Sequence, residues 1–215
     1  MLSARGAAAV AVLVEVLCLA AALLAAAAIS ASGLGGASWR VPSEALRQTL
    51  IAGAYLVPLL IALRLRRSTP ESVGLTRINL GRSVAIGGAL AAVWLLASGT
   101  LGELLRPRVE HVSVLIGALS VGFSEEMVAR GYVQSRLIDW IGTRRGIVLG
   151  TVIFALLHIP QRLLADVGGL ALVQQLLVVA VLGGAFGVLQ ASTRNVALPS
   201  IVHTAIDWSA RFSGG

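Results

Sequence analysis

Long apolar stretches separated by short polar segments make up most of this sequence. A helix needs about 20 apolar residues to cross a lipid bilayer. By that measure we predict seven membrane-spanning helices, at residues 7–30, 45–64, 82–103, 111–135, 145–160, 170–190 and 196–213. No internal repeat and no second domain is visible in the pattern. We therefore expect an all-α fold, a polytopic integral membrane helix bundle that forms a single structural domain.

The composition supports a membrane protein, because 57% of the residues are hydrophobic and only 13% are charged, with a mean hydropathy of +0.88. A soluble domain has about 25% charged residues. The net charge of +7 comes from 17 arginines that are scattered through short polar segments and form no dense patch. We therefore exclude nucleic acid as a partner and expect the lipid bilayer to surround the protein.

The arginines also predict the orientation of the chain. If the chain crosses the bilayer seven times, ten arginines lie at the end of the bundle that holds the N-terminus and six at the other end. Cytoplasmic loops of membrane proteins carry an excess of basic residues. We therefore predict a multi-pass protein of the cell membrane with its N-terminus in the cytoplasm.

Two adjacent acidic residues and an arginine interrupt the fourth apolar stretch. An ionised side chain at the centre of a bilayer costs about 2.5–3.5 kcal/mol on insertion scales, and such residues usually mark function. Glu126 and Arg130 are four residues apart, so on a helix they share a face and can neutralise each other. Glu125 lies about 100° further round the helix and has no partner there. We expect Glu126 and Arg130 to brace the helix and Glu125 to carry chemistry.

Two histidines, His158 and His203, lie in later apolar stretches of the chain. His158 ends the fifth apolar stretch, while His203 and Asp207 are four residues apart in the last one and share a helix face. Because unpaired polar groups are costly in lipid, Glu125 and these three side chains should point into one interior cavity. Two chemistries remain open for such a cavity. It could hold zinc, with all four residues as ligands, or it could hold a water directly, with Glu125 as general base.

Three motifs in order along the chain carry a resemblance to a known family. They are Glu125-Glu126-x-x-x-Arg130, Phe154-x-x-x-His158 and His203-x-x-x-Asp207. In this arrangement on successive membrane helices, the chain resembles the CAAX-protease and bacteriocin-processing family of intramembrane peptidases. The resemblance divides the chain into residues 1–110, three spans without a motif, and residues 111–215, the peptidase core.

The resemblance implies a role for each motif residue. Glu125 would activate water, and His158 and His203 would hold that water or a metal ion. Asp207 would orient His203 or join the metal ligands, at a position where the family often has Asn. Members of the family have been described both as metal-dependent and as glutamic peptidases, so zinc remains an open cofactor.

The expected function is an intramembrane endopeptidase that cleaves a membrane-embedded or lipid-anchored protein or peptide. CAAX-type C-terminal processing and maturation of a bacterial peptide both fit this description. Two alternatives belong to other classes: a non-enzymatic role in peptide immunity or partner assembly, and a proton-coupled transporter, since Glu, His and Asp also relay protons in membranes.

Three further features give expectations that the structure tests. Glu15 interrupts the first apolar stretch and should face the bundle interior. His111 lies at the start of a span with no partner in the pattern and should be exposed. Gly183 and Gly187 form a small-xxx-small pair, which predicts a close approach between helix backbones.

Overall fold

The computed structural model describes residues 2–32, 41–106 and 108–212, and within these ranges every regular element is helical. The elements are α1 (Ala4–Ala31), α2 (Val41–Leu65), the 3-10 turn η1 (Pro70–Val73), α3 (Leu80–Ala97), α4 (Leu101–Leu105), α5 (Val109–Glu126), the π-helical segment η2 (Met127–Gln134), α6 (Ser135–Ile141), α7 (Thr143–Leu157), α8 (Ile159–Leu164), α9 (Gly169–Thr193) and α10 (Ala197–Ser209). The all-α prediction is confirmed.

Six helical stretches in these ranges are long and apolar enough to cross a membrane: α1, α2, α3, the run α5–η2–α6, the run α7–α8, and α9. The seventh predicted span, residues 196–213, corresponds to α10, which has 13 residues. At 1.5 Å per residue α10 is about 20 Å long, shorter than the hydrocarbon core of about 30 Å. The multi-pass helical bundle is thus confirmed, but α10 is too short to be a full span by itself.

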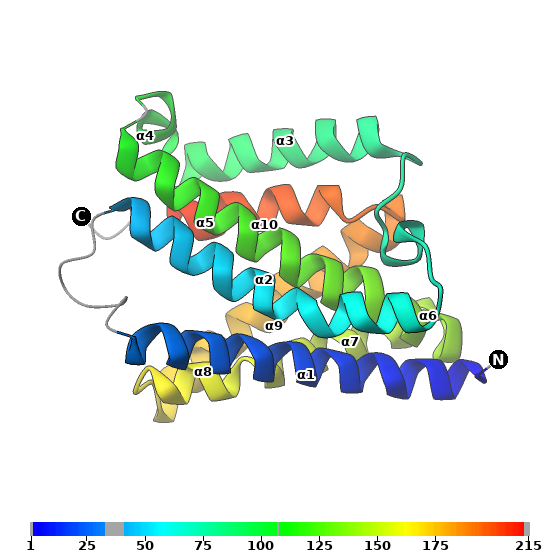
Figure 1. Ribbon diagram of the computed structural model, residues 1–215. Coiled ribbons are helices and arrows are strands. Elements are labelled where there is room, and N and C mark those ends of the chain that lie inside the picture. The colour runs from blue at the N-terminus through cyan, green and yellow to red at the C-terminus, as the bar shows by residue number, and fades with distance from the viewer. Residues whose placement is uncertain (1, 33–40, 107, 213–215) are drawn as a thin grey trace.

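The run α5–η2–α6 is the central helix of the bundle. In its most apolar stretch 50% of the residues are buried, against 22% or less in each of the other five spans. Helix α5 packs on α2 and α10, while η2 and α6 pack on α1 and α7. Figure 1 shows α1 along one side of the bundle and α3 along the opposite side, with α2, α5 and α10 between them. The Glu125-Glu126 pair therefore lies at the middle of the molecule.

The outer helices present apolar side chains to their surroundings. Leu24, Leu65, Leu170 and Val181 are examples of large aliphatic residues that are mostly exposed. Large exposed apolar surfaces of this kind mark contact with a membrane or a partner. Together with the six long apolar helices, they show a protein built to be surrounded by lipid on its flanks.

Helix α1 packs on the central helix through a face of small residues. Its buried side chains recur at three- and four-residue intervals and include Ala8, Ala11, Glu15 and Cys18, as expected for one face of an α-helix. These small side chains form one buried cluster with residues of α2, η2 and α6. Glu15, 2% exposed, lies on this face. Its expected inward orientation is confirmed.

The π-helical segment η2 differs from the uninterrupted α-helix predicted over residues 111–135. At Gly131 an added Cβ would overlap the backbone carbonyl of Val73 in η1, so only glycine fits. Two side chains bond to carbonyls of the widened turn: Ser135 Oγ donates to the Arg130 carbonyl at 3.3 Å, and Arg136 Nη1 donates to the Tyr132 carbonyl at 3.2 Å. Single π-helical turns occur often at functional sites, and this one directly follows Glu126.

Helix α9 approaches the central helix through the two glycines that the sequence singled out. A Cβ at Gly183 would lie 3.1 Å from Nη2 of Arg130, and a Cβ at Gly187 would lie 2.5 Å from Oε1 of Gln134. The predicted close approach is confirmed. It encloses Arg130 and Gln134 completely, and both side chains are fully buried.

Candidate active site

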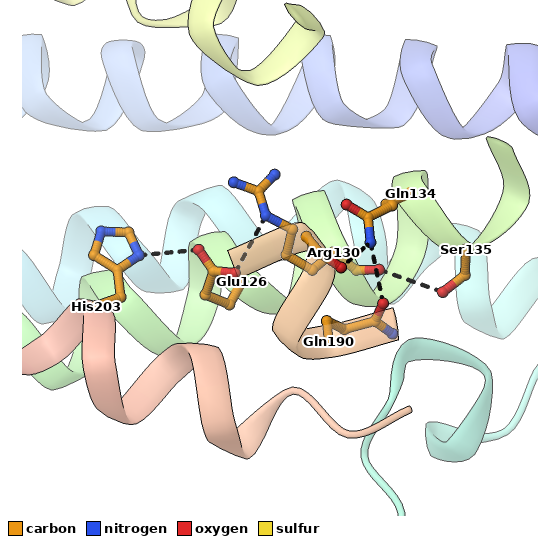
Figure 2. Close-up of polar contacts among 7 residues, drawn as sticks. Glu126, Arg130, Gln134, Ser135, Gln190 and His203 are labelled. Atoms are coloured by element: carbon orange, nitrogen blue, oxygen red, sulfur yellow. Dashed lines mark hydrogen bonds and ion pairs between the residues drawn. The ribbon is translucent and has the colours of Figure 1, made fainter. Parts of the chain in front are cut away.

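Four charged side chains form a line that joins η2, α5 and α10, and we call it the charged line. Its members are Arg130, Glu126, His203 and Asp207. Glu126 and Arg130 are both fully buried, and Oε2 of Glu126 lies 3.4 Å from Nε of Arg130. The other carboxylate oxygen, Oε1, lies 3.1 Å from Nδ1 of His203, as Figure 2 shows. On the far side of the imidazole, Nε2 lies 3.4 Å from Oδ2 of Asp207. Both pairs predicted from the four-residue spacing are present, and Glu126 links them.

His203 is held between two carboxylates. An ionised carboxylate accepts hydrogen bonds and donates none, so both ring nitrogens must carry a proton for His203 to bond Glu126 and Asp207 together. The geometry therefore assigns an imidazolium to His203. The ring of Phe186 stacks on the imidazole at a centroid distance of 5.3 Å. Glu126 therefore has two cationic neighbours, the imidazolium of His203 and the guanidinium of Arg130.

Arg130 is held by one ion pair and one aromatic ring. None of its three guanidinium nitrogens has a hydrogen-bond partner among the described residues, but its Cζ lies 4.2 Å from the centroid of the Phe154 ring. A cation over an aromatic face is stabilised by the ring quadrupole, most strongly where water is excluded. Phe154 also contacts His158 edge-on at 4.6 Å. The Phe154 ring thus connects the charged line to the next helix.

Glu125, His158 and Phe154 are among the residues that line a small cavity. The cavity has a volume of about 30 Å³, and a buried water needs about 10–15 Å³ on the same measure, so it has room for about two waters. Glu125 comes from α5 and His158 from the end of α7. The full lining consists of Glu15, Leu19, Tyr55, Glu125, Phe154, Leu157, His158 and Gln161. A cavity of this size with carboxylate, imidazole, phenol and amide groups in its lining is suited to holding water.

The tautomer of His158 follows from one hydrogen bond. Its Nδ1 lies 2.8 Å from the backbone carbonyl of Phe154, one turn earlier in α7. A carbonyl oxygen can only accept, so Nδ1 carries the proton. In the neutral ring Nε2 then has a free lone pair. His158 therefore offers a hydrogen-bond acceptor at a fixed orientation.

The structure divides the four predicted site residues into two groups. Glu125 and His158 share the small cavity, whereas His203 and Asp207 are absent from its lining. Asp207, with 38% of its side chain exposed, instead lines a larger pocket of about 370 Å³ together with Arg162 and Arg211. Among the described residues no three His, Cys, Asp or Glu side chains are grouped to hold a metal ion.

Some residues near the site were not expected from the sequence. Glu15 of α1, Tyr55 of α2 and Gln161 of α8 all reach the cavity.

The expectation for His111 was wrong: it is only 6% exposed, and its Nδ1 donates to the backbone carbonyl of Glu103 at 2.9 Å. The reason is the short helix α4, whose Glu103 lies over the start of α5 and supplies partners that the local pattern does not reveal.

Comparison with models of known protein families gives a match to the second half of the chain. The family model described as type II CAAX prenyl endopeptidase Rce1-like matches residues 107–209. That range contains all three motifs and the whole run from α5 to α10. The family predicted from the motifs is thereby confirmed over this part of the chain. No curated protein and no solved structure matches the chain.

Proposed function

From the premise that residues 107–209 belong to the Rce1-like family of type II CAAX prenyl endopeptidases, we propose that this protein is an intramembrane endopeptidase with Glu125 as its catalytic carboxylate. The observation that carries the proposal is the cavity of about 30 Å³ that Glu125 shares with His158 inside the helix bundle. It has room for a water, a base to deprotonate that water and a second acceptor to orient it.

The proposed reaction begins with a water bound between Glu125 and Nε2 of His158. Each acceptor takes one of the two O–H bonds, so a lone pair of the water oxygen points away from both and toward a substrate carbonyl. Glu125 removes a proton as the oxygen attacks the carbonyl carbon, and then transfers that proton to the leaving amine as the C–N bond breaks. General base catalysis of this kind contributes about 10²–10⁴-fold.

The charged line positions this pair without contacting the water. Arg130 fixes the Phe154 ring by the cation–π contact, and the Phe154 carbonyl fixes the ring of His158. Glu126, His203 and Asp207 hold Arg130 and the end of α10 in register. We propose that Tyr55 and Gln161 donate hydrogen bonds to the oxyanion that forms on the substrate carbonyl, where each positioned donor contributes about 10²–10³-fold.

The substrate class follows from the family description. The family name specifies prenylated CAAX proteins, which are anchored to a membrane by a lipid. We propose a membrane-embedded or lipid-anchored peptide substrate that enters sideways between helices, and a location in the cell membrane with the N-terminus in the cytoplasm. The distribution of arginines between the two ends of the bundle supports that orientation.

Cleavage of a fluorescent prenylated CAAX peptide in liposomes by wild type and Glu125→Gln tests the proposal. The amide keeps the size and hydrogen bonding of the carboxylate but cannot accept the proton, so kcat should fall by about 10²–10⁴-fold. Glu110→Gln, an exposed glutamate at the start of the same helix, is the matched control and should cleave at the wild-type rate. A Glu125→Gln variant with the wild-type rate would favour a binding or transport role and rule out the assigned base.

A further inference from the structure

Glu15 is a second acidic residue at the cavity, beside Glu125, and it comes from outside the family match. It lies in α1, is 2% exposed and lines the same cavity as Glu125 and His158. Its Oε1 is buried without a hydrogen-bond partner among the described residues. A buried polar atom without a partner costs stability, and such a group usually has a functional cause or an ordered water.

The charges around Glu15 give it no ion-pair partner among the described residues. The charged groups close enough to interact with it are Arg130, Glu125 and Glu126. Arg130 is already paired with Glu126, which also receives His203. The other titratable neighbours are His158 and Tyr55, which line the same cavity, and Cys18 one turn along α1; none of them forms an ion pair with Glu15 in the part of the chain that the structure describes. The hydrogen-bonding capacity of Glu15 is therefore left for what occupies the cavity.

A water in the cavity needs such a group. Buried waters typically make about three hydrogen bonds, with a range of two to four. Glu125 and Nε2 of His158 accept the two O–H bonds of the water. A protonated Glu15 carboxyl, on a different helix, would donate its O–H to one lone pair of the water oxygen and leave the other lone pair for the substrate carbonyl. Three partners from α1, α5 and α7 would fix the position of a water, whereas two leave it free to rotate about the line that joins them.

We propose that Glu15 is a positioning residue of the active site, which holds the attacking water in place for Glu125. The inference rests on the proposed function and adds to it that α1, outside residues 107–209, completes the catalytic cavity. Glu15 then acts through the water and through Glu125, and its carboxyl takes no proton from the substrate. Misplacement of a reacting group by about 1 Å can reduce a rate by about 10²-fold, which sets the size of the expected effect.

Two substitutions separate this role from a structural one. Glu15→Leu removes the hydrogen bond and leaves a side chain of similar size, so we expect kcat to fall by about 10–100-fold with KM unchanged. Because it also removes an unpaired buried carboxyl, it should raise the midpoint of thermal unfolding in detergent. Glu15→Gln keeps a hydrogen-bond donor on a side chain of the same size and should retain cleavage within about threefold of wild type. Cys18→Ala, a buried residue on the same face that does not line the cavity, is the matched control. It should lower the midpoint and leave kcat unchanged.

The results for the Glu15 variants test the positioning role separately from the proposed function, which Glu125→Gln tests. A Glu15→Leu variant that unfolds at a lower temperature, or that cleaves at the wild-type rate, would overturn the positioning role. Equal losses of kcat in Glu15→Gln and Glu15→Leu would also contradict it, because the amide preserves the contact. If Glu125→Gln cleaves normally, the proposed function itself fails. A higher unfolding midpoint in Glu15→Leu would still show in that case that the carboxyl is kept at a cost to stability.

Discussion

Replacement of Arg130 by methionine tests whether the charged line holds the site together. The side chain is fully buried, pairs with Glu126 at 3.4 Å and lies 4.2 Å from the centroid of Phe154. Removal of one partner of a buried ion pair costs about 3–5 kcal/mol, and a desolvated cation–π contact contributes about 2 kcal/mol. Glu126 keeps His203 as a second partner, so we expect a loss near the lower end, about 3 kcal/mol.

The assay is unfolding of the purified protein in detergent, followed by helical circular dichroism, with exposed Arg82→Met as the control. The double variant Glu126→Gln/Arg130→Met should lose less stability than the two single losses combined, because it leaves neither charge unpaired. Arg130→Met should also lower kcat, since the Phe154 ring that contacts His158 loses its cation. A change in stability below about 1 kcal/mol, no larger than that of a surface pair, would refute the reasoning.

Three further predictions concern helix packing, a buried loop contact and metal dependence. Gly187→Ala places a methyl group 2.5 Å from Oε1 of Gln134 and should lower the free energy of unfolding by about 1–3 kcal/mol. Gly184→Ala is the control, because its methyl group meets its nearest neighbour at 3.7 Å and should not change stability. Equal unfolding midpoints for the two variants would contradict the packing. Asn195→Ala removes a buried amide that donates to two carbonyls of the α2–α3 connection and should cost about 2 kcal/mol in the same unfolding assay. Dialysis against a chelator should leave peptide cleavage unchanged, because no suitable group of ligands is present in the described residues; loss of activity that zinc restores would reverse that expectation.

The parts of the site that sequence alone could predict are those fixed by spacing within one helix. Glu126 with Arg130 and His203 with Asp207 are each four residues apart, and both pairs form. The close approach at Gly183 and Gly187 was predictable for the same reason, since a helix places residues four apart on one face.

Partners on different helices were beyond the reach of the sequence. His203 pairs with Glu126 and not with Glu125, because the rotation of α10 against α5 is set by packing along both helices. Within the π-helical segment, Gly131 packs against the carbonyl of Val73, a contact between segments far apart in the chain. Glu15 reaches the cavity because α1 packs on η2 and α6, which a count of apolar residues in α1 does not indicate.

A double-mutant cycle in single-turnover cleavage tests most directly whether Glu125 and His158 act together on one water. It uses Glu125→Gln, His158→Asn and the double variant. The asparagine can still donate to the Phe154 carbonyl but lacks the acceptor at Nε2. Residues that act as a unit have grossly non-additive effects on the rate. We therefore predict that the double variant is about as slow as the slower single variant, and a rate reduced by the product of the two single losses would contradict the account.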